Sequence, residues 1–461
     1  MTATVRPSEH RRATVISNGM FVTGLAIIAI LMPLGHLPNP PESPPYVSMV
    51  LLPLLLQRMV IMAWDGYHQR EGGWPSARVA VAFALPVVAA IAATVTAFNA
   101  NIAWAAAILL FSGLLRGWVL AQYVREREVK LFEDFVLWMT VVVTGFGLFQ
   151  FFGDTFGVPT IWTLLDARYT SAAAFPFPRV QSFALEPLYL AHYLFLPIGI
   201  LLVRRWRTRR ATTFEQVLLI ATLTVLLLTL SRGGILGLLL CVLAMTAVTR
   251  SWRELLYFAR SVVVAFVIVV GLLSLAGAMP NAYAPDNKKA NAMEAFTSHA
   301  VDLSEDSART RYDLWPGTVQ IFLDQPLLGV GPNNSRLLLQ DGTPTTTPDE
   351  AVVMQPVNND YLAYLSEMGL VGIILTLPLI WLVLRSLWGV VRARFDHPSG
   401  PYAFALVGMA FQANSFHSLL MLGTWVVIGL LIAGARLVGE KQAEASDTLE
   451  TTRSPLGAAV A

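Results

Sequence analysis

Long apolar runs alternate with short polar segments along the whole chain. A run of roughly 18 or more apolar residues can cross the hydrocarbon core of a membrane as a helix, because the helix satisfies its own backbone hydrogen bonds. The pattern predicts about twelve transmembrane helices, and therefore an all-α integral membrane protein. The predicted spans lie near residues 17–34, 46–64, 76–97, 99–122, 132–153, 184–203, 216–230, 233–250, 258–279, 358–386, 401–418 and 419–437.

Lysine and arginine predict the orientation, since both accumulate on cytoplasmic loops. Every second loop is rich in them, and the strongest cluster packs Arg204, Arg205, Arg207, Arg209 and Arg210 into seven positions. The loops between these basic loops are poor in both residue types. We therefore predict that both termini are cytoplasmic and that the odd-numbered loops lie outside.

Two of the predicted outer loops are long, at 154–183 and 280–357. Long loops within a compact protein are usually functional or disordered. The sequence predicts four regions: membrane helices one to nine at 1–279, a large periplasmic loop with a helical stretch from Ser307 to Asp324 at 280–357, helices ten to twelve at 358–437, and a disordered cytoplasmic tail at 438–461.

Composition supports the membrane class. Of the 461 residues, 55% are hydrophobic and 13% are charged, whereas soluble domains average about 25% charged residues. The single cysteine, Cys241, excludes an internal disulfide and a cysteine-based metal site. We expect no metal, no cofactor and no nucleic-acid partner.

An arginine at membrane depth is costly and usually marks a function. Arg232 lies in the turn Ser231-Arg232-Gly233-Gly234 between two apolar spans, where the glycines permit close backbone approach. The alternative is an arginine that extends to the lipid headgroups without a further role. Its predicted outer position favours function, because a topology-marking arginine would lie inside.

Two further arginines and a glutamate flank the predicted outer boundary. Arg179 precedes the sixth span, and Glu186 lies at the start of that helix, where the helix dipole stabilises a carboxylate. The alternative for Glu186 is a plain preference for acidic residues at helix starts. Arg309 and Arg311 open the helical stretch of the large loop, and of the two we select Arg311.

The tenth span begins at Asn358-Asn359-Asp360-Tyr361, and helical spacing puts Asp360, Tyr364 and Glu367 on one face. An intramembrane glutamate normally faces the interior of the bundle. Glu367 is then either part of the site or a hydrogen-bonding residue between helices. His417 lies near the outer end of the eleventh span, where it serves the site or is an interfacial residue.

These segments together resemble the O-antigen ligase and polymerase superfamily over roughly residues 175–435. The segments that carry the resemblance are the Ser231–Gly234 turn, Arg311-Tyr-Asp-Leu-Trp315, Asp324-Gln-Pro-Leu-Leu-Gly-Val-Gly-Pro-Asn-Asn334 and Asn359-Asp-Tyr-Leu-Ala-Tyr-Leu-Ser-Glu-Met-Gly369. The resemblance implies a GT-C-like glycosyltransferase of the bacterial inner membrane. Its partners would be an undecaprenyl-pyrophosphate-linked oligosaccharide, a glycan acceptor, membrane lipid and a chain-length regulator.

The resemblance implies a role for each candidate. Arg232 and Arg311 would hold the pyrophosphate, since guanidinium groups bind phosphate oxygens bidentately. Glu186, Asp360 or His417 would take the proton of the attacking hydroxyl. The substrate-binding candidates are Arg179, Asn333, Asn358, Asn359, Tyr361 and Glu367.

One departure favours a polymerase of lipid-linked repeat units, in O-antigen, capsule or exopolysaccharide synthesis. Many members, ligases especially, carry His-Asn where this chain has Asn358-Asn359. An asparagine cannot act as a base, so a ligase-type transfer to lipid A-core becomes the alternative. A transporter or flippase for a lipid-linked glycan, and a membrane anchor without chemistry, are alternatives of other classes. The sequence shows no inverted repeat of broken spans, which many transporters have.

Overall fold

The computed structural model describes most of the chain. It covers residues 21–33, 76–171, 177–184, 186–278, 296–297, 306–340, 343–344, 357–419 and 421–457. The predicted span at 46–64 and much of the predicted loop at 280–357 lie outside these residues.

The described chain is almost entirely helical, which confirms the predicted all-α class. A helix at Phe21–Pro33 precedes α3. The longer helices are α3 (Ala77–Ala93), α4 (Ala100–Tyr123), α5 (Glu126–Thr155), α7 (Pro187–Thr208), α8 (Thr213–Leu228), α9 (Arg232–Thr249), α10 (Trp252–Ala278), α12 (Asp306–Asp324), α13 (Asp360–Arg392), α14 (Gly400–Gln412) and α15 (Leu422–Gly457). Short elements are α6 (Thr160–Thr163), 3-10 turns at Thr94–Thr96, Ala167–Tyr169 and Ser335–Leu337, and the antiparallel two-residue strands β1 (Leu339–Gln340) and β2 (Thr343–Pro344).

Within the described residues, eight helices are long and apolar enough to cross a membrane. The helix at Phe21–Pro33 and α8 are apolar but shorter. The count of about twelve spans stays a prediction. The predicted span at 401–418 is wrong in extent, because α14 ends at Gln412 and residues 413–419 form an irregular loop.

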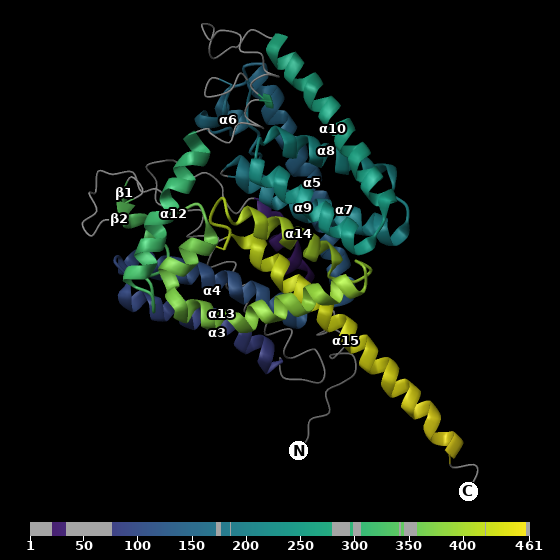
Figure 1. The fold of residues 1–461 in the computed structure, drawn as a ribbon. Coiled ribbons are helices and arrows are strands. Elements are labelled where there is room, and N and C mark those ends of the chain that lie inside the picture. The colour runs from purple at the N-terminus through teal and green to yellow at the C-terminus, as the bar shows by residue number, and fades with distance from the viewer. Residues whose placement is uncertain are drawn as a thin grey trace, which may run out of the picture.

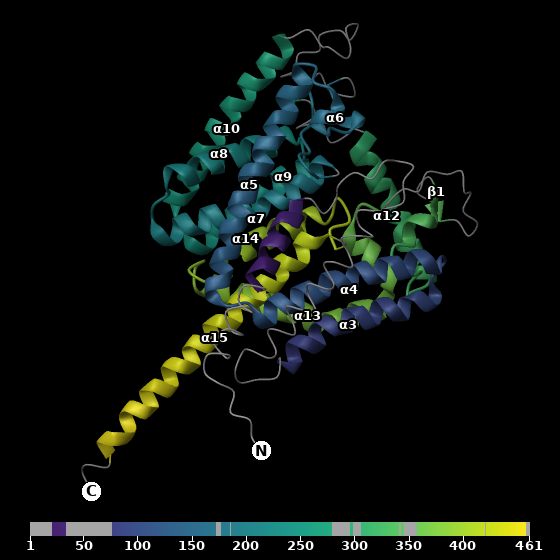
Figure 2. The same cartoon turned by 180° about the vertical axis from the view of Figure 1, so that it is seen from behind.

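The helices form two packed groups (Figures 1 and 2). Helices α3, α4 and α13 lie together on one side, with α12 beside them. Helices α5, α7, α8, α9 and α10 form the other group. The helix at Phe21–Pro33 and α14 belong to this second group's core, whereas α4 and α15 contribute buried residues to both.

Residues 438–457, which the sequence predicted to be a disordered tail, continue α15 to Gly457. This segment begins Glu440-Lys441-Gln442-Ala443, a run of residues that lose little side-chain freedom in a helix. Arg436 and Glu440 form an ion pair at 2.7 Å with helical i, i+4 spacing. In Figure 1 the end of α15 extends well beyond the bundle.

Helix α13 is broken at Gly369, which has φ +61° and ψ −163°. The sequence predicted one uninterrupted span there. In a continuous helix Leu370 and Val371 would donate to the carbonyl groups of Ser366 and Glu367. Here those amides donate instead to Pro326 and Leu327, at 2.8 and 3.1 Å.

The same loop also satisfies the carbonyl groups that the break leaves open. Val330 and Gly331 donate to the carbonyls of Ser366 and Glu367, both at 3.0 Å. Two lost helical hydrogen bonds are therefore replaced by four bonds to residues 326–331, which pair the amides of Leu370 and Val371 and the carbonyls of Ser366 and Glu367. The loop approaches closely, because a Cβ on Gly369 would lie 2.4 Å from the Leu327 carbonyl oxygen.

The opposite side of this loop binds the turn between α3 and α4. Thr96 Oγ1 donates to the Gly329 carbonyl at 2.8 Å, and the Phe98 amide donates to Val330 at 3.2 Å. The Asn99 amide donates to Asn334 Oδ1 at 2.6 Å. Residues 326–334 therefore join α13 to the α3–α4 turn.

We predict that Gly369→Ala destabilises the protein. A side chain strains the positive φ and collides with the Leu327 backbone, which together cost about 2 kcal/mol or more. Thermal unfolding in detergent should show a clear loss. The matched control is Gly145→Ala on α5, where an added Cβ meets nothing within 4 Å. Equal melting temperatures for the two variants would contradict the role assigned to the break.

Candidate active site

The predicted turn at 231–234 is the N-cap and first turn of α9, with Arg232 as the first helical residue, and this Arg232 turn packs tightly against two other segments. Ser231 caps α9, and its Oγ accepts a hydrogen bond from the Gly234 amide at 3.1 Å. A Cβ on Gly234 would lie 2.6 Å from the Ala191 Cβ on α7, and one on Gly233 would lie 3.3 Å from Ser415 Oγ. The two glycines therefore let the turn approach α7 and the loop at 413–419.

Arg179 supports this turn from the side. Its Nε and Nη2 both donate to the Thr229 carbonyl at 3.3 Å, which caps the end of α8. Its guanidinium carbon lies 5.5 Å from the centre of the Tyr169 ring. The positive charge of Arg179 is thereby fixed beside Thr229, which precedes Arg232 by three residues.

Asp360, the first residue of α13, is buried and held by the loop at 413–419. Its Oδ2 accepts from the amides of Ser418 and Leu419, at 2.7 and 3.2 Å, and from the Ser418 hydroxyl. Its own amide donates to the Ala413 carbonyl at 2.8 Å. These bonds fix the carboxylate and leave Oδ1 to face His417.

His417 lies in the irregular loop rather than in the last turn of a span. Its Nδ1 is 3.4 Å from Asp360 Oδ1. Within the described residues no hydrogen bond is formed by its other ring nitrogen, Nε2. Burial by itself lowers the pKa of His417, but the contact with Asp360 and the negative charges of Glu367 and Asp360 raise it above the ordinary histidine value.

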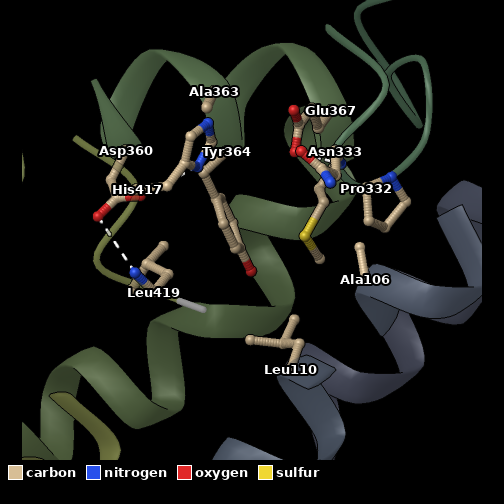
Figure 3. A pocket seen from close by; sticks show the side chains of 11 residues that line it. Ala106, Leu110, Pro332, Asn333, Asp360, Ala363, Tyr364, Glu367, His417 and Leu419 are labelled. Carbon is tan, nitrogen blue, oxygen red and sulfur yellow. Dashed lines mark hydrogen bonds and ion pairs between the residues drawn. The ribbon is translucent and has the colours of Figure 1, made fainter. Parts of the chain in front are cut away.

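A pocket of about 40 Å³ separates these groups (Figure 3). His417 and Asp360 lie on one side of it, Glu367 and Asn333 on the other, and Tyr364 projects between them. The predicted shared face of Asp360, Tyr364 and Glu367 is confirmed, because all three line this pocket. Its other lining residues are Ala106, Leu110, Pro332, Ala363, Met368 and Leu419.

Glu367 orders the loop beside the pocket. Its Oε2 accepts from the Asn333 amide at 2.7 Å, and its Oε1 accepts from Ser335 Oγ at 2.5 Å. Asn333 adopts a positive φ of 58°, which this contact holds in place. Glu367 therefore positions the wall that Asn333 contributes.

Glu186 is the N-cap residue of α7 and lies 3.8 Å from the Arg168 guanidinium. Burial, and then the charge of Glu186, raise the pKa of Tyr169 to about 12. Arg168, Arg179 and Glu186 thus form a charged group around the neutral ring of Tyr169. This group adjoins the Arg232 turn through the contact of Arg179 with Thr229.

Arg311 lies on α12, which begins at Asp306, close to the predicted start at Ser307. Three residues further along, buried Leu314 belongs to one apolar cluster with Val357 and Ala363. Ala363 also lines the pocket. The backbone therefore places Arg311 one turn from a residue packed against the start of α13.

The remaining candidates lie around the start of α13. Asn359 Oδ1 accepts from the amides of Tyr361 and Leu362, at 3.0 and 3.1 Å, and so caps the helix. Tyr361 donates its hydroxyl to the Ala410 carbonyl at 2.8 Å, along α14. Neither Tyr361 nor Asn358 is among the residues that line the pocket.

Residues 217–377 match a family model described as O-antigen ligase. They contain the Arg232 turn, α12, the loop that joins α13, and the start of α13 itself. The chain carries a domain of the O-antigen ligase and polymerase superfamily. This family indicates a glycosyl-transferring membrane enzyme that acts on lipid-linked glycans. No curated protein matches the chain.

The structure brings residues to this site that sequence patterns did not select. Ser418 binds Asp360 across 58 positions, and Ser335 binds Glu367 across 32. Arg336 acts on His417, whose pKa its positive charge lowers, and its buried Nε has no hydrogen-bond partner within the described residues. A basic residue beside the motif ending at Asn334 was the available signal for Arg336.

We predict that Glu367→Gln loosens the wall of the pocket. An amide NH₂ replaces one of the two acceptor oxygens, so one of the donors from Asn333 and Ser335 loses its partner, at a cost of about 1–3 kcal/mol. Amide hydrogen exchange at 331–335 should become faster. Glu440→Gln, an exposed change on α15, is the control. Unchanged exchange at 331–335 would show that Glu367 does not hold this segment.

Proposed function

We propose that this protein polymerises polyprenyl-pyrophosphate-linked oligosaccharide repeat units at the outer face of the cytoplasmic membrane. The observation that carries the proposal is the contact of His417 with the fixed carboxylate of Asp360, beside a pocket and next to the Arg232 turn. This arrangement offers a base for a hydroxyl group and a positive charge for a diphosphate within one region of the fold.

The reaction would be a displacement at the sugar carbon that carries the pyrophosphate. Nε2 of His417 would take the proton of the acceptor hydroxyl, whose oxygen then bonds to that carbon. The carbon–oxygen bond to the pyrophosphate breaks, and the polyprenyl pyrophosphate leaves with the electron pair. Arg232 and Arg311 would bind the charge that develops on this leaving group.

Asp360 would act through His417. A carboxylate that contacts one ring nitrogen fixes the orientation of the imidazole and stabilises its protonated form. Three donors on Oδ2 keep Asp360 in the required position. His417 would thus supply the imidazole that the chain lacks at Asn358.

Asn358 supports a polymerase over a ligase, because the histidine that many family members carry at this position occurs especially in ligases. A ligase that transfers a finished glycan to lipid A-core remains the second candidate. The two functions leave different products when the enzyme is inactive, which the following experiment uses.

We predict that Arg232→Ala and Arg311→Ala abolish long-chain glycan while the protein still accumulates in the membrane. Lysine at either position should restore little, because the bidentate guanidinium is lost. The measurement is gel analysis of glycans in cells that lack the native gene. Arg253→Ala, an exposed arginine on α10, is the control.

Single repeats attached to their acceptor are the expected product in these variants. Long chains that stay on the polyprenyl carrier would instead identify a ligase. Long chains of wild-type distribution in both alanine variants would contradict the assignment of the two arginines.

We predict a pH dependence that reports on His417. A general base must be neutral, so the transfer rate should fall as the pH falls through the raised pKa of His417. Asp360→Asn removes a negative charge that raises this pKa, so the acidic limb of the rate profile should move to lower pH. His417→Gln should lower the rate about 100-fold or more and remove this limb.

The control is Asn414→Ala, an exposed position in the same loop. It should keep both the rate and the pH profile of the wild-type protein. An acidic limb that persists unchanged in His417→Gln would show that another group is the base.

A further inference from the structure

Three helices end together at the other end of the bundle from the candidate active site. Helices α7 and α9 end with the C-cap residues Arg209 and Arg250, which have φ values of 58° and 53°. Arg394, just after α13, has a φ of 50°. Glycine is the residue favoured in this left-handed conformation at helix ends, so arginine occupies all three positions at a conformational cost.

A pocket of about 310 Å³ lies between these helix ends. This volume is at the lower end of the range for small-molecule sites. Three of its seven lining residues are arginines, one is an aspartate, and Trp206 adds an amphipathic aromatic ring. The lining residues are Trp206, Arg207, Arg209, Thr249, Ala393, Arg394 and Asp396.

The three arginines of this pocket are arranged by uncharged partners. The Arg207 guanidinium donates to the His397 carbonyl. The Arg209 guanidinium carbon lies 3.8 Å from the centre of the Trp206 ring, and Trp206 Nε1 donates to the Arg394 carbonyl at 2.9 Å. The guanidinium groups of Arg207 and Arg209 are thus fixed at the pocket, and Arg394 is fixed through its backbone.

Among the residues that the structure describes, two arginines near this pocket, Arg204 and Arg205, form ion pairs with acidic residues, unlike the three arginines that line it. Arg204 pairs with Glu133 and Asp134, at 3.0 and 2.8 Å, and Arg205 pairs with Glu254 at 3.0 Å. In the described part of the chain, none of the three arginines that line the pocket forms an ion pair. Their positive charge therefore remains available to an anion.

The pocket lies at the depth of lipid headgroups. Helix α7 has 22 residues, so its ends are about 33 Å apart at 1.5 Å per residue. One end, at Pro187, adjoins Glu186 and the candidate active site. Because the hydrocarbon core of a bilayer is about 30 Å thick, the Arg209 end lies at the opposite headgroup layer.

We propose that this pocket binds the phosphate of an anionic phospholipid headgroup, of the phosphatidylglycerol class. Basic pockets between transmembrane helices suit such headgroups, and a tryptophan ring is well placed at the interface of membrane and water. Arg207, Arg209 and Arg394 supply the charge, and the two bidentate guanidinium groups of Arg207 and Arg209 fit phosphate oxygens. The proposal uses no residue of the candidate active site and does not depend on the proposed transfer reaction.

The test measures binding of added lipid to the purified full-length protein in detergent, by native mass spectrometry and thermal unfolding. Phosphatidylglycerol should bind and raise the melting temperature, whereas phosphatidylcholine and inorganic phosphate should not. Arg209→Ala/Arg394→Ala should weaken phosphatidylglycerol binding at least tenfold. Arg253→Ala removes an exposed arginine at the same end, outside the pocket, and should bind as the wild-type protein does.

A second variant is expected to strengthen binding, a result that misfolding cannot produce. Asp396→Asn removes a negative charge from the pocket lining and should strengthen phosphatidylglycerol binding. Equal binding by the wild-type protein and the double arginine variant would overturn the proposal. Stabilisation by inorganic phosphate equal to that by phosphatidylglycerol would also overturn it, because the site would then bind a free anion.

Discussion

Four backbone hydrogen bonds hold the loop at 326–331 against the break in α13, and the candidate site depends on them. A helix that stops inside a membrane protein leaves polar groups that must find partners within the protein. The loop satisfies both sides of the break at Gly369. It also binds the α3–α4 turn through Gly329 and Val330. A Cβ on Gly329 would lie 2.4 Å from the Glu367 carbonyl carbon, and one on Gly369 would lie 2.4 Å from the Leu327 carbonyl oxygen, so the loop and the break approach this closely only because both positions, each with a positive φ, are glycine.

The break sets the positions of the acidic residues. The first part of α13 carries Asp360 and Glu367 on one face, and each carboxylate binds a different irregular segment. Asp360 holds the loop at 413–419, whereas Glu367 holds Asn333 and Ser335. His417 and Asn333 thereby face one pocket from opposite sides (Figure 3). The Arg232 turn joins the same region through Ser415 and α7.

Periodicity and composition predicted the helical class and the shared face of α13, because both follow from local spacing. The close backbone approach at the glycines 233 and 234 was also predicted, since neither has a side chain, although both lie in the first turn of α9. The break at Gly369 was not, because its partners lie some 40 positions earlier in the sequence. The same holds for Ser418 and for the loop position of His417. The polar tail continues α15, and Lys441 in it pairs with Glu126 on α5, a contact that composition alone did not predict.

Direct binding of undecaprenyl pyrophosphate to the purified protein tests the central claim, that an arginine-bearing turn beside the broken helix receives a diphosphate. The comparison uses the wild-type protein, Arg232→Ala, and Gly369→Ala in its folded fraction. The account predicts that both variants bind at least tenfold more weakly than the wild-type protein. Wild-type affinity in Arg232→Ala would contradict it.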